Sequence, residues 1–151
     1  GGFCVTKANL QIALLRAMGI PARYRHLHLN KEVLKGILPD WAFDMTADPI
    51  WYHPWCECYL SGKWMVCEPL YDRPLYSAAV EAGIISTEDV PSIDWDGNSD
   101  LKIVTPWIVE DKGAFASLDD VFQEVQRELG PDFATQVAPL LNQHLDSLRN
   151  G

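Results

Sequence analysis

The chain has 151 residues, 48% of them hydrophobic, and this length and composition are typical of one globular domain with a single core. Its 21 acidic and 12 basic residues give a formal net charge of -9, which argues against a nucleic-acid partner. No stretch approaches the ~20 consecutive apolar residues that cross a bilayer, so we expect no membrane partner. The first residues have the pattern of neither a signal peptide nor a transit peptide, and we expect a cytoplasmic protein with one domain over residues 1–151.

The N-terminal segment predicts a helix over residues 4–18. Its apolar residues recur at three- and four-residue steps and spread over more than one face: Leu10, Ile12, Ala13, Leu14, Leu15 and Ala17. A helix that is apolar over so much of its circumference is normally central and buried. Gly19 and Pro21 then end the helix. Residues 22–29 alternate as in a strand, and residues 30–51 are expected to form a long ordered loop with one short helix.

Residues 53–68 have the clearest local pattern in the chain, that of a β-hairpin. Two aromatic-rich runs flank Ser61-Gly62, a good turn dipeptide. Downstream we expect two short helices and an edge strand, over residues 77–82, 87–89 and 101–109. Ser117 is the predicted N-cap of a further helix with a core-facing stripe, formed by Leu118, Val121, Phe122 and Val125. That helix covers residues 118–129, and Pro131 opens a second one that ends near Leu148.

Cys4 stands at the first turn of the predicted N-terminal helix, apart from the other cysteines. A thiol reacts as its thiolate, which the positive end of a helix dipole and an adjacent imidazolium both favour. The free N–H groups at the same helix end can stabilise an oxyanion, and Lys7, one turn away, adds positive charge. An isolated cysteine is otherwise a small apolar core residue, so a catalytic Cys4 requires a partner base.

His53 is the candidate base, and Glu68 is the candidate group that orients it. If the hairpin turn has two residues, Glu68 lies diagonally beside His53 on one face, together with Trp55. A three-residue turn would send Glu68 to the opposite face, and Asp72 is the reserve candidate. The other histidines remain rival bases: His26, His28 and His144.

The segment Gly2-Phe-Cys-Val-Thr-Lys-Ala-Asn-Leu-Gln-Ile-Ala-Leu-Leu-Arg-Ala-Met-Gly-Ile-Pro-Ala-Arg23 resembles the nucleophile helix of the transglutaminase-like superfamily. In that family the cysteine opens a helix that ends in a Gly-Ile-Pro-Ala-Arg turn. Residues 53–64 resemble the family's second motif, a His-x-Trp-x-Glu strand followed by a Gly-x-Trp return. The third motif is usually Asp-Pro, and here Glu68-Pro69 stands in its place. The resemblance covers about residues 2–72, and two motifs in the right order make it specific.

The resemblance implies an α+β fold in which the nucleophile helix packs on an antiparallel β-sheet, as in papain-like and transglutaminase-like enzymes, with C-terminal helices added. It implies proteases, amidases and cross-linking enzymes alike. Among these we favour a cysteine hydrolase (protease, amidase or esterase) that acts on a peptide, amide or ester. Cys4, His53 and Glu68 would form its catalytic triad, with a thioester on Cys4 and no cofactor. Acyl transfer to an amine, as in a transglutaminase, and a catalytically silent binding or assembly module are the alternatives. Only three residues precede Cys4, so either the C-terminal helices or another subunit of a homo-oligomer complete the oxyanion hole, or the site is incomplete.

The remaining cysteines, Cys56, Cys58 and Cys67, raise the question of a metal site with His53. Strand alternation turns His53 away from Cys56 and Cys58, and Cys-x-Cys on a strand is not a usual zinc spacing. We therefore expect no metal. Cys56 lies across the hairpin from Cys67, which is compatible with a disulfide, although we favour reduced cysteines that pack in the core.

Overall fold

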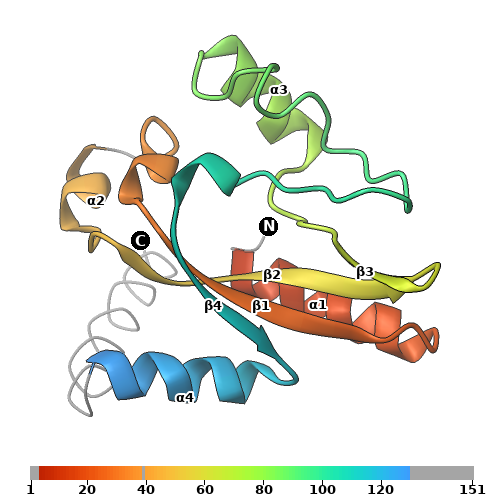
Figure 1. The fold of residues 1–151 in the computed structure, drawn as a ribbon. Helices are drawn as coiled ribbons and strands as arrows, with labels where there is room; N and C mark the ends of the chain where they lie inside the picture. The colour runs from red at the N-terminus through yellow and green to blue at the C-terminus, as the bar shows by residue number, and fades with distance from the viewer. Residues whose placement is uncertain (1–3, 39, 130–151) are drawn as a thin grey trace, which may run out of the picture.

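The computed structural model describes residues 4–38 and 40–129. The helices, 3-10 helices (η) and strands follow one another in the order α1 (Cys4–Ala17), β1 (Ala22–Leu29), η1 (Lys31–Leu34), α2 (Asp40–Met45), β2 (Ile50–Leu60), β3 (Lys63–Val66), α3 (Arg73–Glu81), η2 (Thr105–Trp107), β4 (Ile108–Phe115) and α4 (Leu118–Leu129). The strands form an antiparallel sheet in the order β3-β2-β1-β4 (Figure 1). The predicted α+β class is therefore confirmed. None of the helices in the described ranges is long and apolar enough to cross a membrane.

The predicted hairpin is formed by β2 and β3. Leu60 pairs with Lys63 across Ser61-Gly62, so the turn has two residues. Both turn residues have positive φ, 52° at Ser61 and 81° at Gly62, as a type I′ hairpin turn requires. The short turn on which the expected position of Glu68 depends is therefore confirmed.

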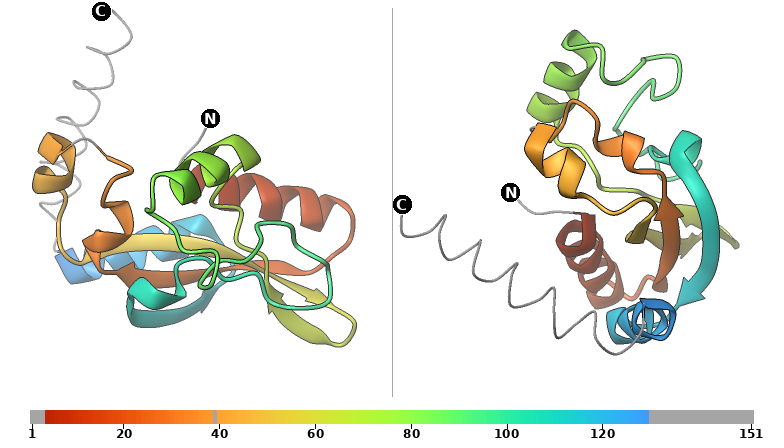
Figure 2. Two further views of the ribbon diagram at one scale, coloured as in Figure 1. Left: turned by 90° about the horizontal axis from the view of Figure 1, so that it is seen from above. Right: turned by 90° about the vertical axis from the view of Figure 1, so that its left-hand side faces the viewer.

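Different side chains cover the two faces of the sheet. On one face, α1 and α4 contribute to a buried cluster with the strands, which includes Ile12, Leu15, Tyr24, Cys56, Cys58 and Val121. On the opposite face, a second cluster includes Leu27, Trp55, Val66 and Val104. Figure 2 shows α1 and α4 close together on one side of the sheet. The strands are therefore buried on both faces where the functional candidates lie.

α1 is buried along one side only, which corrects the prediction of a helix buried around its circumference. Ala8, Ile12 and Leu15 are buried, whereas Leu10 and Leu14 are 62% and 57% exposed. The sheet lies along one side of α1, so apolar residues on the opposite side stay in contact with solvent. Sequence periodicity cannot distinguish these two apolar flanks, because both repeat at helical spacing.

α4 begins where the sequence predicts. The Ser117 hydroxyl caps it by accepting a backbone N–H at 3.1 Å. Within the predicted core stripe, Val121 and Val125 are buried, but Phe122 is 42% exposed. Phe122 lies one position along from Val121, so it points partly away from the sheet. The second predicted helix, over residues 131–148, lies outside the described residues.

The chain between β3 and β4 differs from the prediction. α3 begins earlier than expected because the carboxylate of Asp72 caps it, accepting a backbone N–H at 3.0 Å. Residues 87–89 form a turn and not a helix. The predicted edge strand begins only at Ile108, because Pro106 lies in the 3-10 turn η2. The loop of residues 30–51 contains η1 as well as the one short α-helix expected there, α2.

A β-bulge in β2 directly precedes His53. Leu27 pairs with His53 and Leu29 pairs with Ile50, so one residue of β1 faces two residues of β2 between these positions. An extra residue bends a strand and changes the direction of its side chains. The bulge therefore sets the orientation of His53 relative to the first residues of β2.

Candidate active site

Cys4 is the first residue of α1 and is partly exposed. Its side chain interacts with His53 and raises the pKa of that imidazole. In Figure 1 the first turn of α1 is seen beyond β2, on the side away from β1, whereas the rest of the helix crosses behind the strands. The fold therefore brings the predicted nucleophile near the predicted base, although the two lie far apart in the sequence.

His53 and Glu68 form a buried hydrogen-bonded pair. The distance from His53 Nε2 to Glu68 Oε1 is 2.8 Å, and the two residues are only 4% and 2% exposed. A carboxylate accepts hydrogen bonds, so we assign the proton of this bond to Nε2. Nδ1 is then the nitrogen that can face the thiol of Cys4. This is the arrangement that a general base needs: one ring nitrogen toward the nucleophile and the other held by an acceptor.

The second oxygen of Glu68 is held by backbone groups that the sequence analysis missed. Oε2 accepts the N–H of Ile103 at 2.6 Å and the N–H of Val104 at 3.2 Å. Glu68 therefore has a partner on each of its oxygens despite its burial. Its longer side chain, compared with the Asp of the family motif, reaches His53 and this backbone segment at the same time. Backbone donors carry no side-chain signature, so no residue type in the sequence marks them.

The pKa of His53 reflects three neighbouring effects. Burial opposes the charged imidazolium and lowers the pKa. Hydrogen bonds to Cys4 and Glu68, and the negative charge of Glu68, act in the other direction and raise the pKa of His53 to about 9. His53 is therefore protonated at neutral pH. An imidazolium next to a thiol favours the thiolate, which is the reactive form.

Tyr52 is a second neighbour of Cys4 that the sequence analysis did not single out. Burial raises the pKa of the Tyr52 phenol, and the negative charge of a Cys4 thiolate raises it further. Tyr52 directly precedes His53 in the bulged part of β2. Tyr52 and His53, which are consecutive in β2, are thus both close to the thiol. The sequence pattern alone does not indicate Tyr52.

The supporting residues proposed from the sequence have different positions. Trp55 is buried, 4% exposed, and packs with Leu27 and Val66 on the His53 face of the sheet. The Lys7 ammonium group donates a hydrogen bond of 2.7 Å to a backbone carbonyl, that of Leu70, and so links α1 to the chain after Glu68. The reserve candidate Asp72 is the N-cap of α3, and Glu68 is the carboxylate that contacts His53.

The rival histidines on β1 have other partners. His26 Nε2 is 2.7 Å from the carbonyl oxygen of Trp51, and burial lowers the pKa of His26. His28 Nε2 lies 3.1 Å from Glu128 of α4. His144 lies outside the described residues. Among the described histidines, His53 is therefore the candidate base that interacts with Cys4.

Cys56, Cys58 and Cys67 form a cluster of free thiols in the core below α1. The sulfur of Cys67 is 3.4 Å from that of Cys56 and 3.9 Å from that of Cys58. No disulfide joins them. Within the described residues, no group of three or more Cys, His, Asp and Glu side chains is arranged to hold a metal ion.

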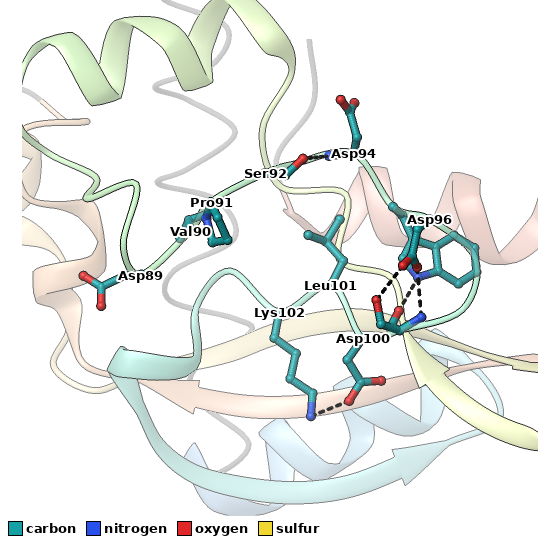
Figure 3. Close-up of a pocket in the computed structure, with 11 residues that line it drawn as sticks. Asp89, Val90, Pro91, Ser92, Asp94, Asp96, Asp100, Leu101 and Lys102 are labelled. Carbon is teal, nitrogen blue, oxygen red and sulfur yellow. Dashed lines mark hydrogen bonds and ion pairs between the residues drawn. The ribbon is translucent and has the colours of Figure 1, made fainter.

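A cavity of about 430 Å³ lies elsewhere, in the loop before β4 (Figure 3). Residues 89–92, 94–96 and 99–102 line it, and none of Cys4, His53 and Glu68 does. Its carboxylates largely have partners of their own, for example Asp94 with Arg73 and Asp100 with Lys102. The cavity is therefore separate from the candidate active site.

A thiol, a buried imidazole and a buried carboxylate in hydrogen-bonded sequence are the parts of a cysteine-dependent acyl-transfer or protease-type site. Comparison with family models agrees with that class. The family described as the transglutaminase-like superfamily matches residues 1–69, the part of the chain that carries both sequence motifs, so this part is similar to that superfamily. No curated protein and no solved structure matches the chain.

Proposed function

We propose that the protein is a thiol-dependent acyl-transfer enzyme that hydrolyses amide or ester bonds through a thioester on Cys4. The observation that carries this proposal is the anchored pair of His53 and Glu68, with a hydrogen bond of 2.8 Å and both residues buried. Buried groups whose pKa values are shifted by a specific charge partner occur frequently at functional sites, which favours a reactive role for this pair. The interaction of Cys4 with His53 supports the same proposal.

In the first step, the Cys4 thiolate attacks the carbonyl carbon and forms a C–S bond, and the carbonyl oxygen becomes an oxyanion. The backbone N–H groups of the first turn of α1 have no intrahelical acceptor and stabilise this charge. The bond to the leaving nitrogen or oxygen then breaks, and the His53 imidazolium donates its proton to the leaving group. Glu68 keeps the imidazole in the tautomer that this transfer needs.

In the second step, the thioester is resolved by water. His53, now neutral, accepts a proton from the water molecule while its oxygen attacks the thioester carbon. The C–S bond breaks, the carboxylic acid product leaves, and the thiolate of Cys4 and the imidazolium of His53 are restored. An amine in place of water would give the transamidation of a transglutaminase by the same proton transfers. A catalytically silent binding module remains the alternative from another class.

The test compares wild type with Cys4→Ala on three substrate types: p-nitrophenyl esters, aryl amides, and a glutamine peptide with an added amine. We expect ester and amide hydrolysis that Cys4→Ala abolishes, with esters turned over faster because their leaving group is easier to expel. Leu10→Ala is the matched control, because Leu10 lies on the exposed side of the same helix. It should retain wild-type rates.

Two results would overturn the proposal. Turnover that Cys4→Ala does not reduce would exclude Cys4 as the nucleophile. Absence of turnover on all three substrates, together with iodoacetamide alkylation of Cys4 that is unaffected by His53→Ala, would support the silent module. A product formed only when the amine is present would replace hydrolysis by transamidation as the function.

A further inference from the structure

The backbone segment that holds Glu68 is itself joined to the strand that leads into Glu68. Leu101 and Cys67 form a parallel bridge, outside the named strands of the sheet. The Leu101 N–H donates to the Val66 carbonyl at 2.8 Å, and the Glu68 N–H donates to the Leu101 carbonyl at 3.1 Å. We call residues 100–104 the Glu68 clamp.

This bridge determines where the N–H groups of the clamp point. Once Leu101 is paired beside Cys67, the next residues run alongside Glu68. The N–H groups of Ile103 and Val104 then reach its carboxylate oxygen. A bridge of this length has few hydrogen bonds of its own. An additional hydrogen bond at its start therefore contributes strongly to holding the clamp in register with Cys67 and Glu68.

Asp100 supplies that contact. Its Oδ1 accepts the N–H of Val66, the last residue of β3, at 2.9 Å. Its Oδ2 pairs with the ammonium group of Lys102 at 2.7 Å, and Figure 3 shows these two side chains joined at the edge of the cavity. A hydrogen bond to a charged acceptor is roughly twice as strong as one between neutral groups. The side chain thus ties the first residue of the clamp to the end of β3.

We infer that Asp100 is a positioning residue of the proposed active site: through the Val66 N–H it holds the clamp in the alignment that fixes Glu68 against His53. The inference rests on the proposed function, since it concerns the same site. Asp100 does not touch Cys4 or His53 and acts only through Glu68. Misplacement of a site group by about 1 Å lowers rates by roughly 100-fold, so a small shift of the clamp is sufficient for an effect.

The experiment compares Asp100→Ala with Asp100→Asn and Lys102→Met in the full chain, with p-nitrophenyl acetate as the probe. We expect Asp100→Ala to lower kcat roughly 10- to 100-fold at unchanged KM. Asp100→Asn keeps an oxygen acceptor for the Val66 N–H and should retain kcat within about threefold. Lys102→Met leaves that acceptor intact and should resemble wild type. Asp100→Glu moves the carboxylate by one methylene, and its kcat should lie between those of Asn and Ala.

The pH dependence supplies a readout that a merely structural role would not move. A loosened Glu68 supports the His53 imidazolium less well, so the pKa of His53 should fall below its value of about 9. The alkaline limb of the kcat/KM profile, where the free enzyme loses the His53 imidazolium, should then shift to lower pH in Asp100→Ala, and not in Asp100→Asn. Asp94→Ala, which breaks an exposed ion pair with Arg73 in the same loop, is the matched control.

Each outcome has a definite meaning. If wild type has Cys4-dependent turnover and Asp100→Ala retains its kcat and pH profile, the positioning role is overturned and the proposed function stands. If Asp100→Asn lowers kcat as much as Asp100→Ala does, the hydrogen bond from the Val66 N–H to residue 100 does not determine activity, and the inference fails. If Asp100→Ala does not fold, Asp100→Glu against Asp100→Asn decides in the same way. A wild type without Cys4-dependent turnover overturns the proposed function, and this role with it.

Discussion

The sulfur of Cys67 lies 3.4 Å from the sulfur of Cys56, directly across the hairpin that also carries His53. Both cysteines are at most 1% exposed. Hydrogen bonding to Cys56 and burial raise the pKa of Cys67, and burial raises the pKa of its other neighbour, Cys58, to about 12. Since thiols react as thiolates, Cys58 and Cys67 are poor nucleophiles in the folded protein, and Cys56 is buried beside them.

The first prediction concerns the reactivity of the four cysteines. Iodoacetamide should modify only Cys4 in the native protein and all four thiols in denaturant, as counted by mass spectrometry of the alkylated chain. The rate at Cys4 should fall on His53→Ala, because the imidazolium that favours the thiolate is then absent. Modification of Cys56 or Cys67 at a rate similar to that of Cys4 would show that the core below α1 opens readily.

The second prediction concerns the charge of Glu68. In Glu68→Gln the amide oxygen can still accept the N–H groups of Ile103 and Val104, but its NH₂ group would face His53 Nε2. That nitrogen would then have to act as an acceptor, which is the wrong tautomer for a base toward Cys4. We expect kcat/KM to fall by roughly 10²- to 10⁴-fold in steady-state assays of ester hydrolysis.

Glu68→Ala separates stability from chemistry. It removes the acceptor of three hydrogen bonds at a buried position and leaves His53 without its ion-pair partner. Loss of one partner of a buried pair costs about 3–5 kcal/mol, so urea unfolding should show a much lower midpoint than for Glu68→Gln. Equal stabilities of the two variants would mean that the contacts with the clamp contribute little to folding.

The third prediction is that stability falls with rising pH because of His53. Its folded-state pKa of about 9 is raised above the unfolded value of about 6.5. The native state therefore holds the proton more tightly, and this contribution is fully present below pH 6.5 and lost as the pH rises through 9. The slope of the unfolding free energy in that window should reach at most about 1.4 kcal/mol per pH unit. His53→Gln, measured by urea unfolding at the same pH values, should lack this slope.

The fourth prediction compares the two apolar sides of α1. Ile12 is 1% exposed, so Ile12→Ala should lower the unfolding free energy by about 2–5 kcal/mol. Leu14 is 57% exposed, and Leu14→Ala should change it by no more than about 0.5 kcal/mol. Both values come from urea unfolding of the full chain. A large loss for Leu14→Ala would mean that its side of the helix is covered in solution.

Much of the candidate site could be predicted because it depends on local patterns. The turn dipeptide Ser61-Gly62 sets the hairpin register, and the register puts Glu68 beside His53. The position of Cys4 follows from the helix that begins there. These features need only the periods of helices and strands, which a single sequence displays.

The parts that could not be predicted depend on contacts between distant segments. The N–H groups of Ile103 and Val104 belong to a short parallel bridge, which leaves no alternating pattern in the sequence. The carbonyl that binds Lys7 is equally unmarked. The exposed side of α1 is a further case. The hydrophobicity of a side chain can be taken from the sequence, but whether another element covers that side chain cannot.

The bridge between the end of β3 and the Glu68 clamp also has a consequence for the order in which the protein is assembled. Glu68 and its two N–H donors are 35 and 36 positions apart in the chain. Such contacts form after local ones, because loop closure must first be overcome, and synthesis delivers the later residues last. Residues 1–69 carry the whole family match and the thiol, imidazole and carboxylate, yet a nascent chain of that length lacks the donors. The N–H donors of Glu68 are thus available only after the clamp has left the ribosome, so the proposed site gains its full set of partners late in synthesis.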